Sequence, residues 1–219
     1  MGQKMDKGGF WTPGPPDIMS IAWNCRGLAN PRAVNFFKEL VQQVRPSLIF
    51  LSEILGKKKK IEKVCRTIHF ADCFVVESHG QGGGFALLWK NPGAVEIKGS
   101  CNHYIDFEVV CDQIGRWRYT GFYGCPERYR RYESWELLRG LADESNLPWC
   151  VVGDFNEMMF AHEKRGGKPH PRGLLDCFTK TVSDCGLMDM GFVGNEFIWE
   201  RSRGQYKWIH ERLDRGLAN

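Results

Sequence analysis

After residue 18 the sequence opens with a strand, a helix and a second strand, and this order limits the folds open to the chain. Residues 19–23 form a short apolar run, and residues 32–44 then carry apolar side chains at helical spacing. Residues 47–52 (SLIFLS) are almost continuously apolar, which is typical of a strand buried on both faces. Two such strands joined by a helix predict a β-α-β unit in a layered α/β protein.

The remaining chain adds further helices and two groups of strands, which predicts more than one sheet. A basic helix is expected near residues 57–69, with later helices at 132–142 and 173–185. Residues 1–18, rich in Gly, Pro and Lys, are expected to be a flexible lead-in to one domain over residues 19–219. The expected strands are 73–77, 85–90, 94–99, 104–110, 117–123, 148–152, 197–199 and 206–209.

The composition is that of a globular protein, and we expect an intracellular location. The 219 residues are 42% hydrophobic and 26% charged, which suffices for one large domain. Nine cysteines are scattered without CxxC or Cys/His ligand spacing, so we expect reduced thiols and no disulfide-linked partner. We expect neither a secretory signal nor a membrane span. The net charge of +4 allows an anionic partner without identifying one.

Polar residues follow four of the predicted strands, and this recurrence is the main functional signal. They are Asn24, Glu53, Tyr123 and the pair Asp154 and Asn156. Each alone has a structural interpretation: a turn residue, a solvated acid, an interface-facing aromatic or a helix cap. Together they suit one chemistry. A carboxylate binds a hard divalent cation, a second carboxylate orients water, and amides and a phenol hold phosphate oxygens.

Five short motifs contain these residues or follow them along the chain. They are residues 23–28 (WNCRGL), 50–53 (FLSE), 121–124 (GFYG), 153–156 (GDFN) and 211–215 (ERLDR). In this order they resemble the motifs of the endonuclease/exonuclease/phosphatase superfamily. More narrowly, the chain resembles the endonuclease domain of plant LINE-type non-LTR retrotransposons, a likeness strengthened by residues 83–89 (GGFALLW) and 147–149 (LPW). The resemblance extends from about residue 20 to residue 218.

The resemblance implies an α/β (α+β) four-layered sandwich, with two mixed β-sheets packed face to face and helices outside. It also implies phosphodiester cleavage that depends on Mg²⁺, with Mn²⁺ as an alternative ion. DNA is the expected partner, no membrane contact is expected, and the nucleus is preferred to the cytoplasm as the location.

The resemblance also assigns roles to the residues at the strand ends. Glu53 corresponds to the main metal ligand, with Asn24 beside it at the phosphate. Asp154 corresponds to the residue that orients or deprotonates the attacking water, and Asn156 holds Asp154 and a phosphate oxygen. Tyr123 corresponds to a tyrosine near the scissile phosphate.

Two features depart from the family pattern. Arg26 stands where apurinic-site endonucleases of the superfamily have an acid, so it is a candidate phosphate contact and not a second metal ligand. The family's Ser-Asp-His motif does not occur between Asp214 and Asn219, although Asp214 matches the catalytic aspartate that orients that histidine. We therefore expect a C-terminally truncated domain that lacks the last strand or strands, leaves a sheet edge unpaired and is catalytically impaired.

Basic residues near the predicted site are candidate nucleic-acid contacts. Residues 128–132 (RYRRY) alternate basic and aromatic side chains, so Arg128, Arg130 and Arg131 are expected to contact phosphates or bases. The four lysines at residues 57–60 either hold a nucleic-acid backbone or form a solvated helix face. Two alternatives stay open. One is a phosphatase acting on small phosphoesters or inositol lipids, and the other is a non-catalytic remnant or nucleic-acid-binding module.

Overall fold

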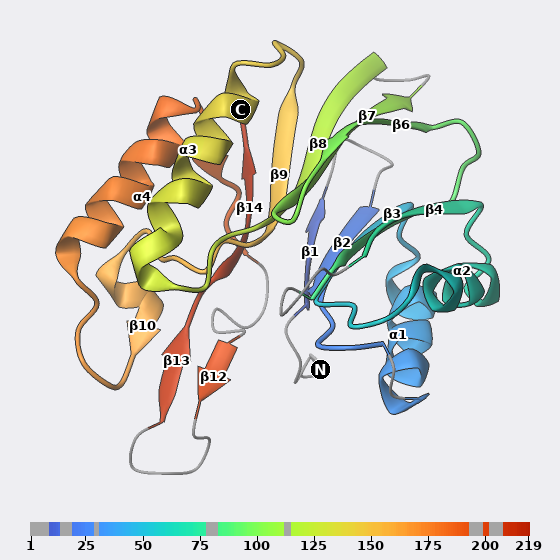
Figure 1. Ribbon diagram of the computed structural model, residues 1–219, viewed down its shortest axis with the longest axis horizontal. Coiled ribbons are helices and arrows are strands. Elements are labelled where there is room, and N and C mark those ends of the chain that lie inside the picture. Colours follow the sequence, from blue (N-terminus) through green and yellow to red (C-terminus); the bar gives the residue numbers. More distant parts are fainter. Residues whose placement is uncertain are drawn as a thin grey trace.

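Between residues 19 and 184 the helices and strands follow the order predicted from the sequence (Figure 1). The computed structural model describes residues 9–13, 19–28, 31–77, 83–111, 115–192, 199–201 and 208–219. The elements are β1 (Gly9–Pro13), β2 (Met19–Asn24), α1 (Pro31–Val44), β3 (Leu48–Ser52), α2 (Lys58–Thr67), β4 (Asp72–Val76), β5 (Phe85–Trp89), β6 (Val95–Ser100), β7 (Tyr104–Cys111), β8 (Gly115–Tyr123), η1 (Arg128–Arg130), α3 (Arg131–Ala142), β9 (Trp149–Asp154), η2 (Ala161–Glu163), β10 (Lys164–Arg165), α4 (Arg172–Asp184), β11 (Met188–Asp189), β12 (Trp199–Arg201), β13 (Ile209–Glu211) and β14 (Asp214–Ala218).

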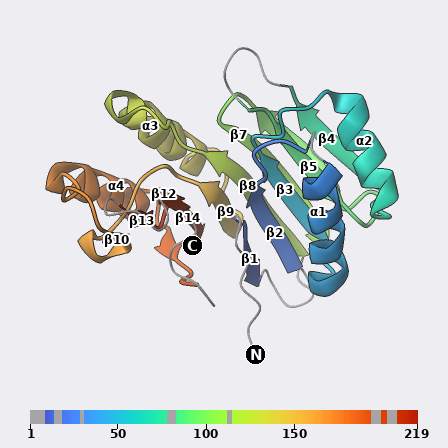
Figure 2. The same cartoon turned by 90° about the horizontal axis from the view of Figure 1, so that it is seen from below.

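Two mixed sheets lie face to face at the centre of the protein. One has the strand order β1-β2-β3-β5-β4 and the other β11-β14-β9-β8-β7-β6. Each contains one parallel pair, β2 with β3 and β8 with β9, among antiparallel neighbours. Figure 2 shows α1 and α2 on the outer face of the first sheet and α3 and α4 on that of the second. The predicted four-layered sandwich is confirmed.

Three apolar layers hold the sandwich together. Phe37 of α1 and Ile61 of α2 are fully buried against the first sheet, because the apolar positions of both helices recur at helical spacing. Leu138 of α3 and Phe178 of α4 are likewise buried against the second sheet. Between the sheets, the inward side chains of β2, β3 and β5 pack against those of β7, β8 and β9. In the described part of the chain, no helix is long and apolar enough to cross a membrane.

The structure differs from the prediction mainly at its edges. Gly9–Pro13, expected within the flexible lead-in, form β1 and pair antiparallel with β2; that part of the prediction is wrong, because the segment extends the first sheet. Strand β14 was not predicted from the sequence. Strand β11 pairs with part of its outer edge, at the side of the second sheet where we expected an unpaired edge. The predictions at residues 197, 198, 206 and 207 lie outside the described residues.

One glycine sets how closely the two sheets approach. A Cβ atom placed on Gly121 of β8 would lie 2.1 Å from the Cδ2 atom of Phe50 in β3. Phe50 is only 1% exposed and belongs to the layer between the sheets. Its ring therefore occupies the space that any larger residue at position 121 needs.

We expect Gly121→Ala to lower the free energy of unfolding by about 1–3 kcal/mol, because the buried ring must shift or the sheets must separate. Gly140→Ala is the matched control. Gly140 lies in α3, and a Cβ there meets no atom within 4 Å. Alanine should stabilise that helix by up to about 1 kcal/mol. Urea unfolding measures both, and equal effects at the two positions would contradict this account of the sheet packing.

Candidate active site

Four strands that bear predicted site residues end at the same end of the sandwich. Asn24 ends β2 and is paired in register with Ser52, which directly precedes Glu53. Tyr123 ends β8 and is paired with Asp154, the last residue of β9. Asp214 begins β14 opposite Asp154. Because both parallel pairs end together, the polar residues of the two sheets face one another across the interior.

Glu53 lies at the centre of the hydrogen bonds that join these residues. Asn24 Nδ2 donates to Glu53 Oε1 over 2.7 Å, and the Tyr123 hydroxyl donates to the same oxygen over 2.8 Å. Asn24 Nδ2 also lies 3.4 Å from Asp154 Oδ2. Asn24 thus contacts an acid from each sheet. The structure brings together Asn24, Glu53, Tyr123 and Asp154 as the sequence predicted; their catalytic roles stay predictions.

Asp154 and Asn156 form a turn directly after β9. The backbone N–H of Asn156 donates to Asp154 Oδ1 over 2.9 Å, so the carboxylate also caps this turn. Asn156 Nδ2 donates to the carbonyl of Gly124 over 2.9 Å. Gly153 has a φ of +147°, and a Cβ there would lie 1.9 Å from the carbonyl oxygen of Phe122. Glycine is therefore required where the chain leaves the sheet.

The backbone adopts the left-handed conformation at several residues around the site. Arg26, Glu53, Leu55 and Asn156 have φ values of 43°, 54°, 43° and 52°. Such conformations are unfavourable for residues with a Cβ and tend to occur where function demands them. The Glu53 turn is held by Gly83, because a Cβ on Gly83 would lie 2.3 Å from the Glu53 Cα. The sequence motif at residues 83–89 includes this glycine, but nothing in that motif indicates its contact with Glu53.

Burial of neighbouring acids changes their proton affinity. Burial raises the pKa of Asp154 to about 6, and the charge of Glu53 adds to the increase, while hydrogen bonds from Asn156 and Asn24 oppose it. The pKa of Asp214 is also raised well above its ordinary value, first by burial and then by the charge of Asp154. Burial raises the pKa of Tyr123, and the charges of Asp154 and Glu53 raise it further, so its phenol stays protonated at neutral pH.

This arrangement can be compared with known proteins. The Endonuclease/Exonuclease/phosphatase family matches the chain over residues 21–216. The chain belongs to this family. The match includes every residue described above as part of the site. Members of the family hydrolyse phosphodiesters or other phosphoesters, and they generally depend on a divalent metal ion. No curated protein matches the chain.

Solved structures share the fold at low sequence identity. The endonuclease domain of TRAS1, a telomere-specific non-LTR retrotransposon, has a TM-score of 0.65 at 12% identity and covers 91% of this chain and 84% of that one. The 3′ phosphatase NExo from Neisseria, bound to product DNA hairpin, gives 0.69 at 16%, with 91% and 86% covered. A mannosyl-6-phosphatase from Bacteroides thetaiotaomicron gives 0.60 at 14%, with 92% and 85% covered.

The residues of this site fit a hard divalent cation. Asn24 Oδ1 is buried and has no hydrogen-bond partner in the described part of the chain, although Asn24 Nδ2 is fully engaged. It is a free oxygen donor beside the Glu53 carboxylate. Amide and carboxylate oxygens are ligands that Mg²⁺ and Mn²⁺ accept. No cluster of three or more acidic, His or Cys ligands occurs among the described residues.

A cavity of about 590 Å³ opens beside Glu53 and Tyr123. Its other described walls come from residue 55, residues 76–77, residues 83–85, residues 102–103 and residues 126, 127 and 130. His103 Nδ1 lies 3.0 Å from the carbonyl oxygen of Tyr123, so this histidine supports the tyrosine backbone. Nothing in the local sequence pattern around His103 links it to residue 123.

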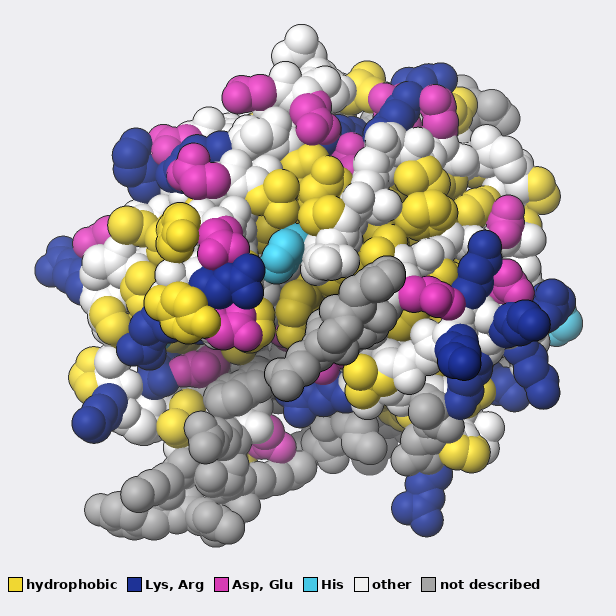
Figure 3. Space-filling view, in the orientation of Figure 1, with side chains coloured by type: hydrophobic (Ala, Val, Ile, Leu, Met, Phe, Trp, Pro, Cys, Tyr) yellow, Lys and Arg dark blue, Asp and Glu magenta, His cyan; other side chains and the backbone are white. Residues whose placement is uncertain are grey.

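The predicted nucleic-acid contacts have different environments. Arg26 and Arg128 are exposed, and Arg130 lines the cavity with its guanidinium 2.8 Å from Glu133. Arg131 lies only 2.7 Å from Glu157, a fully buried acid, and is itself largely buried. The structure therefore gives Arg131 a structural ion pair where the sequence led us to expect a surface contact. Figure 3 shows other Lys and Arg side chains gathered where α2 lies in Figure 1.

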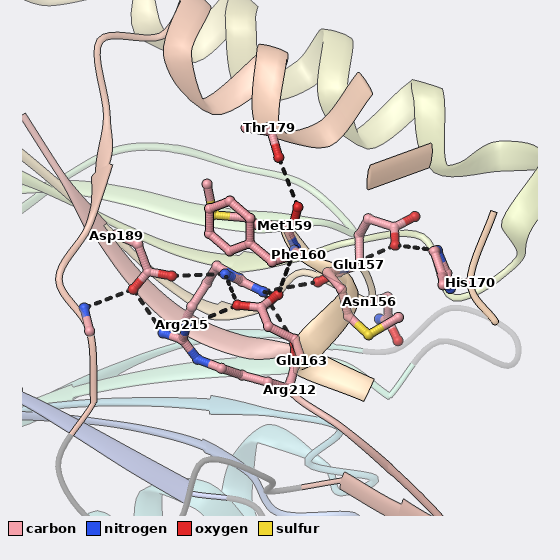
Figure 4. Close-up of polar contacts among 12 residues, drawn as sticks. Asn156, Glu157, Met159, Phe160, Glu163, His170, Thr179, Asp189, Arg212 and Arg215 are labelled. Carbon is pink, nitrogen blue, oxygen red and sulfur yellow. Dashed lines mark hydrogen bonds and ion pairs between the residues drawn. The ribbon is translucent and has the colours of Figure 1, made fainter. Parts of the chain in front are cut away.

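A buried ion cluster, formed by Glu163, Asp189, Arg212 and Arg215, holds the strand that carries Asp214 (Figure 4). Arg212 and Arg215 lie 3.0 and 2.9 Å from the two oxygens of Glu163. The same arginines lie 2.7 and 2.8 Å from Asp189. Arg215 and Glu163 are almost completely buried. The cluster therefore fixes the start of β14, where Asp214 meets Asp154.

The cluster keeps its acids ionised, unlike the acids of the site. Burial alone would raise the pKa of Glu163, but the hydrogen bonds and charge of Arg215 outweigh it and hold the pKa below the ordinary value of 4.5. The pKa of Asp189 is lowered in the same way, against burial, by Arg212 and Arg215. The motif around Asp214 indicated that residue alone, and no local signal linked the arginines to Glu163.

We expect Glu163→Gln to lower the free energy of unfolding by about 3–5 kcal/mol at neutral pH, because two buried guanidinium groups lose a charged partner. The pH dependence should change as well. A carboxyl with a lowered folded-state pKa stabilises the fold above its unfolded value, and this stability is lost as the pH falls through the folded value. The wild-type protein should therefore lose stability below about pH 4.5 more steeply than Glu163→Gln.

Urea unfolding at several pH values measures both effects. Asp176→Asn serves as the control, because Asp176 forms an exposed pair with Arg172 over 3.9 Å and its loss should change little. Equal stability of the wild-type protein and Glu163→Gln at neutral pH would show that the cluster does not support β14.

Proposed function

We propose that the protein is a divalent-metal-dependent phosphodiester hydrolase that cleaves DNA, as an endonuclease of the type found in non-LTR retrotransposons. One observation carries the proposal. Asn24 holds Glu53 and Asp154 together with its amide nitrogen and leaves its buried oxygen free beside the Glu53 carboxylate. A cation, a phosphate oxygen and a water oriented by Asp154 fit this arrangement.

In the proposed reaction each residue has a separate task. Asn24 Oδ1 and the Glu53 carboxylate hold the cation, Mg²⁺ or alternatively Mn²⁺, which when bound supplies a Lewis acid that neutralises phosphate charge. Tyr123 fixes Glu53 through its hydroxyl hydrogen. The raised pKa of Tyr123 keeps that hydrogen in place at neutral pH. Asn156 aligns Asp154 through its backbone N–H.

Asp154 is the proposed base that receives a proton from the attacking water. With a pKa of about 6 it is mostly ionised at neutral pH, yet it holds a proton better than an ordinary aspartate. Among the described residues no side chain donates a hydrogen bond to the Asp214 carboxylate, its neighbour. We therefore propose slow turnover by this chain, because among the described residues no side chain that is hydrogen-bonded to Asp214 is placed to protonate the leaving group.

DNA is preferred to a small phosphoester for reasons of sequence and surface. The motifs at residues 23–28 and 211–215 resemble those of LINE-type endonucleases, and those of plant elements most of all. Exposed Arg26 adjoins the site, where a phosphate backbone would pass. A nuclear location follows from a DNA substrate and is part of the proposal.

A plasmid-nicking assay with Mg²⁺ tests the function. We expect slow, Mg²⁺-dependent nicking that falls by about 10²- to 10⁴-fold in Glu53→Gln and in Asp154→Asn, because each change removes a group used in the transition state. Glu136→Gln is the control, since this exposed acid on α3 pairs only with Arg139. Nicking should survive that change.

The same assay separates the alternatives. Nicking that persists in both Glu53→Gln and Asp154→Asn would exclude the proposed site. Faster hydrolysis of a soluble phosphomonoester than of DNA, lost in the same variants, would indicate a phosphatase. Tight DNA binding with no hydrolysis of either substrate would indicate a non-catalytic binding module.

A further inference from the structure

Helix α2 carries a row of three cations on its outer face, defined here as the α2 row: Lys59, Lys63 and Arg66. Their spacing of four and three residues places them on one side of the helix. At 100° per residue this side lies opposite the buried positions Ile61, Val64 and Cys65. All three cations are exposed, and so are Lys57 and Lys58 just before them.

The three cations of the α2 row stand on one helix face and are not neutralised by acids of the described residues. No carboxylate in the described part of the chain lies within ion-pair distance of Lys59, Lys63 or Arg66. Some exposed cations elsewhere are paired with acids, as in Lys98 with Glu96 and Lys180 with Asp184. A row of unpaired positive charges attracts an anionic group from outside the chain.

The two lysines of the α2 row do not serve the stability of their own helix, although Arg66 in the last turn complements the helix dipole. The first turn of α2 contains three lysines and no acid, and its N-cap residue makes no side-chain capping hydrogen bond. Cations at a helix N-terminus oppose the helix dipole, and like charges four residues apart repel each other. Burial of Ile61, Val64 and Cys65 against the first sheet holds the helix in place despite these charges.

The N-terminal end of α2 adjoins the candidate active site. The backbone N–H of Lys58 donates to Glu77 Oε1 over 2.9 Å. Glu77 and Leu55 line the cavity together with Glu53 and Tyr123. The loop from Glu53 to Lys57 thus leads from the site to the start of the row. Figure 3 shows Lys and Arg side chains on the side of the molecule where α2 lies in Figure 1.

We propose that the α2 row binds consecutive backbone phosphates of a nucleic acid whose scissile phosphate occupies the candidate active site. This inference rests on the proposed function and adds a path for the substrate. Residues 59–66 span about 10 Å of helix axis at 1.5 Å per residue. Duplex DNA places one phosphate per strand about every 3.4 Å along its axis, so three cations match about three phosphates.

The test is binding of a labelled duplex DNA of about 20 base pairs, measured by fluorescence anisotropy without divalent ions so that no cleavage occurs. The variant combines Lys59→Gln, Lys63→Gln and Arg66→Gln. We expect the slope of log K against log salt to become shallower by about 2–3, since each lost phosphate contact removes about 0.9. Affinity at low salt should fall at least about tenfold.

A control variant removes the same number of charges elsewhere. It combines Lys168→Gln, Arg172→Gln and Lys180→Gln, all exposed and on the side of the second sheet. Its salt slope should stay that of the wild-type protein. Equal slopes in the two variants would overturn the inference, because net charge alone would then explain the binding. Thermal unfolding of the α2 row variant should not occur at a much lower temperature, since removal of Lys59 and of the Lys59–Lys63 repulsion offsets the loss of Arg66 from the last turn.

Two further results separate this inference from its rivals and from the proposed function. If the α2 row variant lost binding to phosphatidylserine vesicles but kept its DNA affinity, the inference would be wrong and the row would be a membrane contact. If Asp154→Asn abolished nicking while the α2 row variant bound DNA normally, the function would stand and the inference would fail. Loss of DNA binding in the α2 row variant would support the inference even if no variant changed nicking.

Discussion

The contact of Asn24 with Glu53 and Asp154 is the interaction on which the site depends, because it joins the two sheets at their shared end. The sheets are held together elsewhere by apolar packing, which is non-directional and does not fix one strand end against another. Hydrogen bonds of defined length do so here. A single amide thereby sets the separation of two acids that come from different sheets, and a phosphoester hydrolase requires those acids at a fixed distance.

The protein contains two kinds of buried acid, and the difference lies in their partners. Glu163 and Asp189 face two arginines each, and their pKa values are lowered. Asp154 and Asp214 face each other, and their pKa values are raised. The arginines around the first pair, Glu163 and Asp189, stabilise the ionised carboxylates and therefore the fold. The charges of Arg26 and Arg215 do not offset the burial of the second pair, which costs stability but leaves a carboxylate able to exchange a proton near neutral pH.

Periodicity was sufficient to predict most of the fold. The helices from α1 to α4 and the strands from β2 to β9 have apolar patterns that persist for a full element, so each could be placed within a few residues. Strands β10 and β11 have two residues each and show no pattern of their own. Strand β1 has no local signal for pairing either, because its partner is β2 and the pairing is tertiary.

The site was predictable to the extent that its residues stand at strand ends, where the fold itself brings them together. Asn24, Glu53, Tyr123 and Asp154 met this condition. The partners of Arg131 and Arg215 did not, since Glu157 and Glu163 lie in an irregular segment whose course depends on the whole fold. The sequence around a charged residue is equally consistent with a surface contact and with a buried ion pair. Only the position of its partner decides between them.

The charges around the site also restrict how a substrate can approach it. Glu53, Asp154 and Asp214 together with Glu77 and Glu127 make the site and its cavity acidic, and an approaching phosphate is repelled. A cation at Asn24 Oδ1 and Glu53 would offset this repulsion only locally. Attraction over a longer range must come from basic groups outside the acidic centre, and the exposed cations of the α2 row lie there. A substrate with many phosphates can reach both regions at once, which a small phosphoester cannot do.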